Sequence, residues 1–316
     1  MELYFLGTGA GMPSRERNVT SIVLKLYEER GTFWMFDCGE GTQHQVLRSP
    51  LRLSKLEKLF ITHLHGDHLY GLPGLLTSRS YQGGEKPLTI YGPPGLKQFL
   101  DVVLSTSDAH LDYELEVVEI REGVVFEDEG FMVETALLEH RIDSYGYRIV
   151  EKDKPGRLLH EKLLQDGVPQ GPLYARIKRG ETVTLPDGRQ ITPSLYVAPP
   201  IPGRIVVILG DTRVCENSRR LSRNADVLVH EATFGADLED RARRYFHSTS
   251  VEAARAAKEC GVKQLIMTHF SSRYADEEVG RLVEEAMAFL PDVYSAHDFW
   301  SFPIPRKLPP DSPSNP

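Results

Sequence analysis

The feature that most constrains this chain is a run of metal-binding residue types directly after an apolar segment. Residues 62–68 read T-H-L-H-G-D-H, which places three histidines and an aspartate behind the apolar residues 59–61. The apolar segment is typical of a buried strand, and in an extended backbone side chains two positions apart point to the same side. His63 and His65 can therefore converge on one metal ion. The alternative, a chance grouping of surface or core histidines, is disfavoured by the aspartate at this spacing.

The rest of the run is placed to serve a second ion beside the first. Asp67 and His68 follow Gly66, where the chain turns, and precede the segment L-P-G-L-L at 72–76. Pro73 is typical of the first turn of a helix. Asp67 and His68 are therefore expected on a loop that faces a neighbouring point in space. The sequence predicts two adjacent metal ions.

The composition is that of an ordinary globular protein. Of the 316 residues, 41% are hydrophobic and 26% are charged, which suffices for one large core or two smaller ones. Cys38, Cys215 and Cys260 are odd in number and far apart, so a disulfide framework is not expected and a reducing cytoplasm is favoured. Residues 1–6 are interpreted as a first strand rather than a leader. No apolar run reaches membrane-spanning length.

Short apolar runs alternate with helical patterns through most of the chain. This rhythm predicts layers of strands and helices, with candidate ligands gathered along one edge. The predicted strands are 3–6, 21–27, 33–36, 58–62, 88–91, 133–138, 204–209, 227–229 and 264–268, and the predicted helices are 251–260 and 277–289. We divide the chain into a first core half (1–150), an inserted arm (151–202), a second core half (203–302) and a tail (303–316) that is expected not to pack.

The composition changes in the inserted arm, where many basic residues appear although the chain as a whole is acidic. The formal net charge is −8, which argues against a general polyanion binder, so contact with RNA or DNA would need a local basic patch. Residues 151–202 carry Lys152, Lys154, Arg157, Lys162, Arg176, Lys178, Arg179 and Arg189 among many glycines and prolines. A short helix is expected at 158–165 and a hairpin at 182–188. A flexible linker and a dimerisation tongue remain alternatives that composition leaves open.

Three further ligand candidates follow expected strands: His140, Asp211 and His269. A histidine at a strand end is often structural, but together with the first run these residues complete two sites. The first ion would be held by His63, His65 and His140, the second by Asp67, His68 and His269, and both by Asp211. Ligation by nitrogen and oxygen suits zinc, with manganese or another divalent metal as the alternative. Asp37 is expected to orient a ligand or the histidine loop, and His230 to be structural.

The histidine run and several other motifs resemble one known superfamily. The His-x-His-x-Asp-His pattern at 63–68 is similar to that of the metallo-β-lactamase superfamily, and the chain more narrowly resembles the bacterial short-form ribonuclease Z family of tRNA 3′-processing endonucleases. The resemblance runs from residue 3 to about residue 297, through F-L-G-T-G at 5–9, P-S-R-E-R-N at 13–18, F-D-C-G-E-G-T at 36–42, T-H-L-H-G-D-H-L-Y-G-L-P-G-L-L at 62–76, G-D-T at 210–212, H-E-A-T at 230–233, H-S-T at 247–249 and T-H-F-S-S-R-Y at 268–274. Arg15 stands where relatives often have lysine, which keeps the charge.

The resemblance implies an α/β fold, a four-layered αββα sandwich, with two zinc ions per subunit. It also implies a cytoplasmic hydrolase that removes the 3′ trailer from precursor tRNA after the discriminator nucleotide and leaves a 3′-hydroxyl. The arm at 151–202 would grip the tRNA, and two subunits would form a homodimer in which one arm serves the other active site. Residues expected to contact the substrate are Arg15, Arg17, Arg176, Lys178, Arg179 and Arg273.

Catalytic roles follow from what phosphodiester hydrolysis needs. A bound zinc lowers the pKa of water from about 15.7 to about 7, and the leaving 3′-oxygen needs a proton. The family assigns that proton to His247, which precedes a helix start where Thr249 and Glu252 have capping-box spacing. Glu231 is expected to hydrogen-bond the imidazole and favour its protonated form. Asp67 is expected to be a ligand and an acceptor of the water's proton. A simple helix-cap role is the alternative for His247.

Other functions remain as alternatives at this point. A small-substrate metallohydrolase or phosphodiesterase of the same fold would have no use for a basic arm. A di-iron oxidoreductase of the superfamily would carry a carboxylate at the position of His65. A non-catalytic RNA-binding protein would not need the complete ligand set. The sequence leaves open the native metal, the effect of an encoded CCA and the range of precursors.

Overall fold

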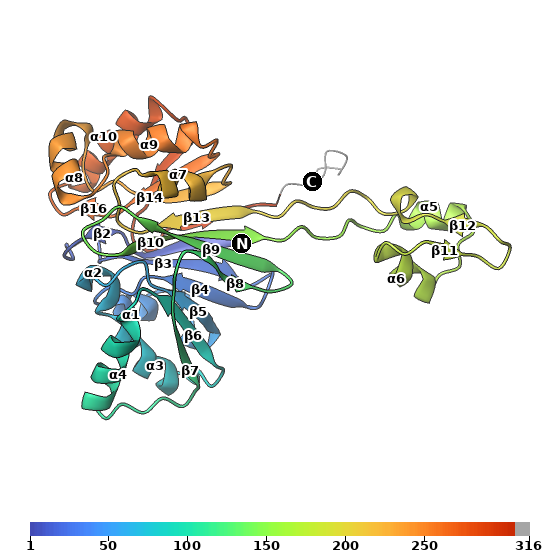
Figure 1. Ribbon diagram of the computed structural model, residues 1–316, viewed down its shortest axis with the longest axis horizontal. Coiled ribbons are helices and arrows are strands. Elements are labelled where there is room, and N and C mark those ends of the chain that lie inside the picture. Colours follow the sequence, from blue (N-terminus) through green and yellow to red (C-terminus); the bar gives the residue numbers. More distant parts are fainter. Residues whose placement is uncertain (307–316) are drawn as a thin grey trace. The chain divides into compact units, whose positions relative to one another are not determined.

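Residues 1–306 are described in the computed structural model of the chain (Figure 1). They divide into two compact units. The core unit contains Met1–Val150 and Ile205–Ile304, and the inserted unit contains Glu151–Arg204 with the described residues that follow Ile304. Among residues 1–306, no helix is long and apolar enough to cross a membrane.

The core unit is built on two seven-stranded sheets. The first has the order β18 (Ser301–Pro303), β1 (Glu2–Gly7), β3 (Ser21–Leu26), β4 (Thr32–Phe36), β5 (Leu56–Phe60), β6 (Leu88–Gly92) and β7 (Leu115–Glu119). The second has the order β17 (Val293–Ser295), β15 (Gln264–Thr268), β14 (Val227–Glu231), β13 (Ile205–Leu209), β10 (Ser144–Glu151), β9 (Phe131–Leu138) and β8 (Gly123–Glu127). A short pair, β2 (Gly9–Ala10) with β16 (Phe270–Ser271), links the two halves of the sequence.

The two sheets form the inner layers of a four-layered αββα sandwich (Figure 1). Strand alternation explains this arrangement, because Leu3 and Phe5 of β1 join the cluster between the sheets whereas Tyr4 and Leu6 point to the helical side. The helices α1 (Thr42–Leu47), α3 (Leu72–Tyr81) and α4 (Leu96–Thr106) cover the first sheet. The helices α7 (Glu216–Ser222), α9 (Ser250–Glu259) and α10 (Asp276–Met287) cover the second. The predicted fold class is confirmed.

The central strands of each sheet end at one edge. Strands β4, β5 and β6 pair in parallel, as do β13, β14 and β15. Parallel strands bring their carboxyl ends to the same side, where segments leaving the sheet can meet. The histidine run follows β5, Asp211 follows β13, and His269 follows β15. Sheet topology therefore delivers residues from distant parts of the sequence to a common place.

The predicted strands of the core are confirmed, while several peripheral elements escaped prediction. Strands β7 and β8 alternate exposed and half-buried residues and carry glutamates, so they lack the apolar run of a central strand. The tail predicted from Pro303 is wrong for its first residues, because Pro303 belongs to β18 and Ile304 is buried with its N–H bonded to the Met1 carbonyl. Residues 307–316, the remainder of that prediction, lie outside the described residues.

The inserted unit has a small core of its own. It contains α5 (His160–Gln165), α6 (Pro172–Lys178) and the hairpin of β11 (Val183–Thr184) and β12 (Gln190–Ile191), which confirms the short helix and the hairpin. Buried apolar side chains of these elements form one cluster: Leu163, Val168, Tyr174, Ile177, Val183, Leu185, Ile191 and Tyr196. Where the unit begins and ends, Arg204 donates from Nε to Glu151 at 2.7 Å, and Arg306 also pairs with Glu151.

A carboxylate at the margin of the first sheet offers a test of this fold. Glu57 of β5 accepts hydrogen bonds from Arg30 (2.7 Å), Thr32 (2.6 Å) and the Trp34 indole (3.2 Å). Burial raises the Glu57 pKa, but the bonds from Arg30 and Thr32 outweigh it and hold the pKa below its ordinary value. We expect Glu57→Gln to lower the free energy of unfolding by about 1–3 kcal/mol near neutral pH, because buried donors lose a charged acceptor.

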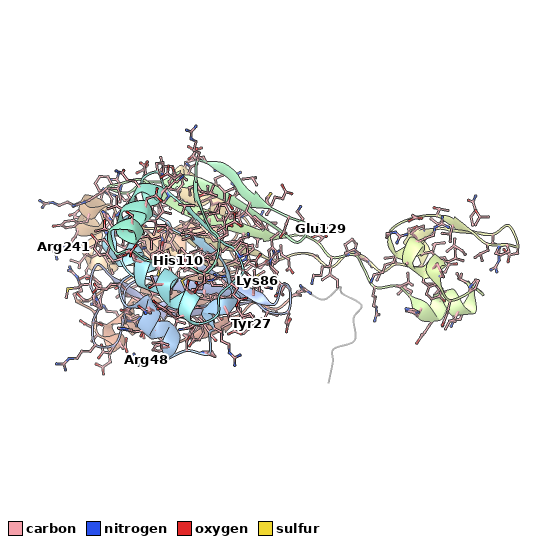
Figure 2. The ribbon with its side chains drawn as sticks, turned by 90° about the horizontal axis from the view of Figure 1, so that it is seen from below. Tyr27, Arg48, Lys86, His110, Glu129 and Arg241 are labelled. Atoms are coloured by element: carbon pink, nitrogen blue, oxygen red, sulfur yellow. The ribbon has the colours of Figure 1, made fainter. Side chains whose placement is uncertain are left out.

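Because the folded-state pKa of Glu57 is lowered, its contribution is present above the unfolded pKa and fades as pH falls through the folded value. Urea unfolding of the metal-free protein at several pH values measures this. Glu129→Gln, at an exposed carboxylate labelled in Figure 2, is the matched control. Equal stability of the two variants at neutral pH would contradict the expectation.

Candidate metal centre

The histidine loop is held in place by one carboxylate. Asp37 follows β4 with a positive φ of 59° and accepts bonds from the Thr62 backbone N–H (2.7 Å) and the Thr62 hydroxyl (2.8 Å). The same carboxylate accepts from His68 Nδ1 at 2.7 Å. Asp37 therefore fixes the start of the loop and orients His68, as the sequence predicted. Beyond the loop, His65 lies at the N-terminus of the short helix α2 (Gly66–Leu69).

Four histidines, His63, His68, His140 and His269, direct their Nε2 atoms toward a common point. Each Nδ1 faces an acceptor: His68 faces Asp37 (2.7 Å), His140 the Phe246 carbonyl (3.0 Å), His63 the Thr62 hydroxyl (3.0 Å) and His269 the Thr233 hydroxyl (2.9 Å). Both hydroxyls already donate to carboxylates, so they accept from the imidazoles. The Nδ1 atoms then carry the protons, and the Nε2 lone pairs face inward. This tautomer pattern is typical of metal-ligating histidines.

The candidate ligand atoms form four overlapping groups among the described residues, and the two groups without His247 correspond to the sites predicted from the sequence. The first is His63, His65 and His140, and the second is Asp67, His68, Asp211 and His269; within each group the candidate ligand atoms lie within 4.8 Å of one another. Asp211 Oδ2 lies 3.8 Å from His63 Nε2 and 3.3 Å from His269 Nε2, so this carboxylate reaches both groups. All seven side chains predicted as ligands are thus brought together by the fold.

The electrostatics of the cluster call for positive charge. Burial raises the pKa of Asp211, but facing His269 and His68 hold it well below its ordinary value. Burial lowers the pKa of His68, yet Asp211 and Asp67 raise it well above its ordinary value. His68 Nε2 and His269 Nε2 lie only 3.3 Å apart, and His63 Nε2 is buried with no hydrogen-bond partner among the described residues. In the metal-free protein a second proton on His68 meets part of this demand, and the unpartnered His63 nitrogen together with the clustered carboxylates fits bound cations.

His247 lies beside the two groups and has a different environment. It precedes α9, whose capping box pairs Thr249 with Glu252 as the sequence predicted. His247 Nδ1 donates to Glu231 Oε1 at 2.9 Å, and Thr233 donates to the other oxygen of Glu231 at 2.5 Å. Burial lowers the His247 pKa, but the Glu231 carboxylate outweighs it and raises the pKa to about 9. His230 contributes to neither ligand group and bonds the Glu231 carbonyl through Nδ1.

An open cavity of about 420 Å³ leads to these residues. Its wall contains two contacts between a guanidinium and an aromatic ring. Of their four residues, the sequence had predicted only Arg273. The carbon of the Arg141 guanidinium lies 5.0 Å from the ring centroid of Tyr245, and that of Arg273 lies 5.2 Å from the ring centroid of Phe234. Arg241, at the surface of the core unit (Figure 2), also lines the cavity. Position next to His140 was the only sequence signal for Arg141.

The predicted substrate contacts are distributed unevenly. Arg273 lines the cavity, and Arg15 is exposed. Arg17 is buried, and its guanidinium bonds Thr8 (2.8 Å), the Ala296 carbonyl (2.7 Å) and Asp276 (2.8 Å), so its prediction as a direct substrate contact is wrong. It ties the P-S-R-E-R-N loop to the second half of the chain instead. The remaining candidates are exposed side chains at the end of α6 and directly after it: Arg176, Lys178 and Arg179.

Comparisons with known proteins give a family match to the first half of the chain and, under a different name, relatives that match nearly all of it. The first half, residues 1–154, matches the family described as Anti-Pycsar protein Apyc1. Ribonuclease Z of Anoxybacillus flavithermus is 56% identical over 307 residues, covering 97% of this chain and 98% of that protein. Ribonuclease Z of Bacillus licheniformis is 55% identical over 306 residues, covering 97% and 100%. The crystal structure of human tRNase Z, short form, superposes with a TM-score of 0.71 at 32% identity, covering 96% and 100%.

The contact between His247 and Glu231 predicts a titration. We expect Glu231→Gln to shift the His247 pKa from about 9 toward its ordinary value of 6.5, because the carboxylate is the largest influence that raises it. A raised folded-state pKa stabilises the fold fully below the unfolded value, and this contribution is lost as pH rises through about 9. NMR titration of the imidazole in the metal-free protein measures both variants. Glu139→Gln, at an exposed carboxylate next to His140, is the control. A His247 pKa indifferent to Glu231→Gln would refute the assignment.

Proposed function

The chain belongs to the ribonuclease Z family, and on that premise we propose that its His/Asp cluster holds two zinc ions that serve cleavage of precursor tRNA. The protein is a hydrolase, an endoribonuclease that processes the 3′ end of tRNA. In the proposed reaction the 3′ trailer is removed after the discriminator nucleotide, and the tRNA keeps a 3′-hydroxyl.

The observation that carries the metal proposal is the inward array of Nε2 atoms around Asp211. Hydrogen bonds to the Nδ1 atoms fix the ring orientations before any ligand arrives, which lowers the cost of assembling a site. The donors are nitrogen and carboxylate oxygen without sulfur, a set that zinc accepts and that manganese also tolerates. When bound, such a metal pair supplies an activated water at neutral pH and neutralises charge on the phosphate.

The chain's own residues would handle the protons. In this hydrolysis water adds to phosphorus, the bond to the 3′-oxygen of the retained nucleotide breaks, and the trailer departs with a 5′-phosphate. His247 would donate its proton to that 3′-oxygen, since its imidazole is cationic and can release a proton, whereas the arginines of the cavity wall keep theirs. Glu231 would hold the imidazole through Nδ1, which leaves Nε2–H directed to the substrate. Asp67, which accepts from the Gly11 N–H at 2.8 Å, would take the water's proton.

Recognition of the tRNA body is proposed for the inserted unit. The chain as a whole has a net charge of −8, so binding to RNA needs concentrated cations. Arg176, Lys178 and Arg179 are exposed on one short stretch of this unit. Glu181 pairs with both arginines, and the exposed pairs are weak enough for phosphates to replace the carboxylate. We also propose a homodimer and a cytoplasmic location, which rest on family membership alone.

Loss of the proposed proton donor gives the first functional prediction. We expect His247→Ala to keep its metal content and to lower kcat on precursor tRNA by about 10²- to 10⁴-fold, the range of general acid catalysis. Asp211→Asn is expected to lose metal as well as activity, because it replaces the carboxylate that reaches both groups with a neutral amide. Elemental analysis and a cleavage assay measure the two quantities.

His110→Ala, at an exposed histidine far from the cluster in sequence and labelled in Figure 2, is the control. It should match the unmodified protein in both measurements. If His247→Ala loses metal to the same degree as Asp211→Asn, His247 is a ligand and the proposed role is wrong.

Charge reversal in the inserted unit gives the second functional prediction. We expect the triple variant Arg176→Glu, Lys178→Glu and Arg179→Glu to weaken precursor tRNA binding and to flatten its salt dependence by about 0.7–0.9 per lost phosphate contact in log units. Hydrolysis of a small phosphodiester should change little, because these residues are outside the candidate metal centre.

The matched control reverses the charge of three exposed lysines of the core unit by substituting glutamate for Lys55, Lys86 and Lys97. It changes the net charge equally, so general repulsion of RNA is subtracted. Binding curves at several salt concentrations provide the measurement. Equal salt slopes for the two triple variants would exclude the proposed role of the inserted unit.

A further inference from the structure

A second cavity opens onto the candidate metal centre beside the first. The arginine cavity is the one of about 420 Å³ described above, with Arg141, Arg241 and Arg273 in its wall. A second cavity of about 350 Å³, the tyrosine cavity, is lined by Tyr70, Glu40, Pro13 and Gly66. Both include Gly11, His65 and Asp67 in their walls. The candidate centre therefore lies where the two cavities meet, so one RNA strand can pass it by occupying both.

His247 makes the two sides chemically different. It lines the arginine cavity and is absent from the wall of the tyrosine cavity, all of whose residues belong to the described part of the chain. A proton donor must lie beside the oxygen that leaves. In the proposed reaction that oxygen is the 3′-oxygen of the retained nucleotide, so the retained nucleotide must lie on the side of His247.

We propose that the discriminator nucleotide occupies the arginine cavity and that the first trailer nucleotide occupies the tyrosine cavity with its base stacked on Tyr70. This inference rests on the proposed function and adds a strand direction and a binding site for the trailer. It names Tyr70 as the trailer contact and Tyr245, with Arg241, as contacts of the retained end.

The geometry of Tyr70 suits a stacking platform. Tyr70 is 63% exposed although it follows α2 at the centre of the site. The ring packs against the backbone of Gly66, where an added Cβ would lie 2.2 Å from the Tyr70 Cε2 atom. Glycine at this position thus makes room for the ring, which is supported on one side and open on the other. Aromatic stacking tolerates any base, as trailers of varied sequence require.

Charge separates the two sides in the same sense. The arginine cavity carries three guanidiniums, whereas the wall of the tyrosine cavity contains Glu40 and no Lys or Arg among its described residues. The retained side continues into the phosphates of the tRNA body, which guanidiniums bind well. A side without cations holds the trailer chiefly through its base and releases it after cleavage.

The test compares Tyr70→Ala with Tyr245→Ala on two RNAs: a precursor tRNA and the same tRNA ending at the discriminator 3′-hydroxyl. Loss of one stacked base is expected to lower kcat/KM on the precursor about 5- to 150-fold in Tyr70→Ala. Inhibition by the trailer-less tRNA should remain within about twofold in that variant, since its end does not reach the tyrosine cavity. Tyr245→Ala should weaken both interactions, and Tyr70→Phe should restore cleavage because the ring, not the hydroxyl, makes the contact.

A binding measurement follows each nucleotide without turnover. Precursors carrying 2-aminopurine at the first trailer position or at the discriminator position are bound to the holoprotein bearing His247→Ala, in which slow cleavage is expected. Adding Tyr70→Ala should relieve quenching at the trailer position only, and adding Tyr245→Ala should relieve it at the discriminator position.

The opposite pattern, with Tyr70→Ala weakening the trailer-less tRNA and Tyr245→Ala sparing it, would reverse the strand direction and overturn the proposal. A change of oligomeric state in Tyr70→Ala would assign this side chain to a subunit contact instead, which also overturns it. Failure of the unmodified protein to cleave the precursor would instead refute the proposed function, so the two failures are distinguishable.

Discussion

The buried Asp37 carboxylate is the interaction on which the rest of the site depends. It receives the Thr62 backbone, the Thr62 hydroxyl and His68 Nδ1, so one side chain sets both where the histidine loop starts and how a ring within it points. Asp37 itself adopts a positive φ of 59°, an uncommon conformation for a residue with a Cβ. Three hydrogen bonds to a buried carboxylate offset that strain.

Positive φ values recur at two other residues beside the cluster. His269 has φ 58° and Phe246 has φ 62°, the first a candidate ligand and the second the residue whose carbonyl receives His140 Nδ1. The facing Nε2 atoms of His68 and His269 likewise gain little from one another in a buried place. The metal-free site therefore carries an unfavourable free energy from its backbone conformations and its electrostatics. Bound cations would offset this free energy, because they attract both the facing nitrogens and the clustered carboxylates.

Local sequence predicted much of this arrangement, for reasons that individual residues make clear. The spacing of His63 and His65 encodes their convergence because strand geometry has a fixed period of two residues. Central strands such as β13 are unbroken apolar runs, which is typical of a strand buried on both faces. Arg17 shows the opposite case: its charge suggested RNA, yet Thr8, Asp276 and the Ala296 carbonyl enclose it. The residues near Arg17 in the sequence do not predict its partners Asp276 and Ala296, which lie near the other end of the chain.

The sequence by itself determined the donor types, their pairing along the histidine run and the family to which these motifs belong, because these depend on residue identity and local spacing. Only the tertiary structure decided which ring atom each histidine presents, that Asp211 reaches both groups, and that Tyr70 and Tyr245 line separate cavities at one centre. Those outcomes depend on hydrogen bonds and packing between segments far apart in the chain. Such contacts depend on how the sheets bring strand ends together. Local sequence patterns cannot predict them, because they describe only residues that are close in the chain.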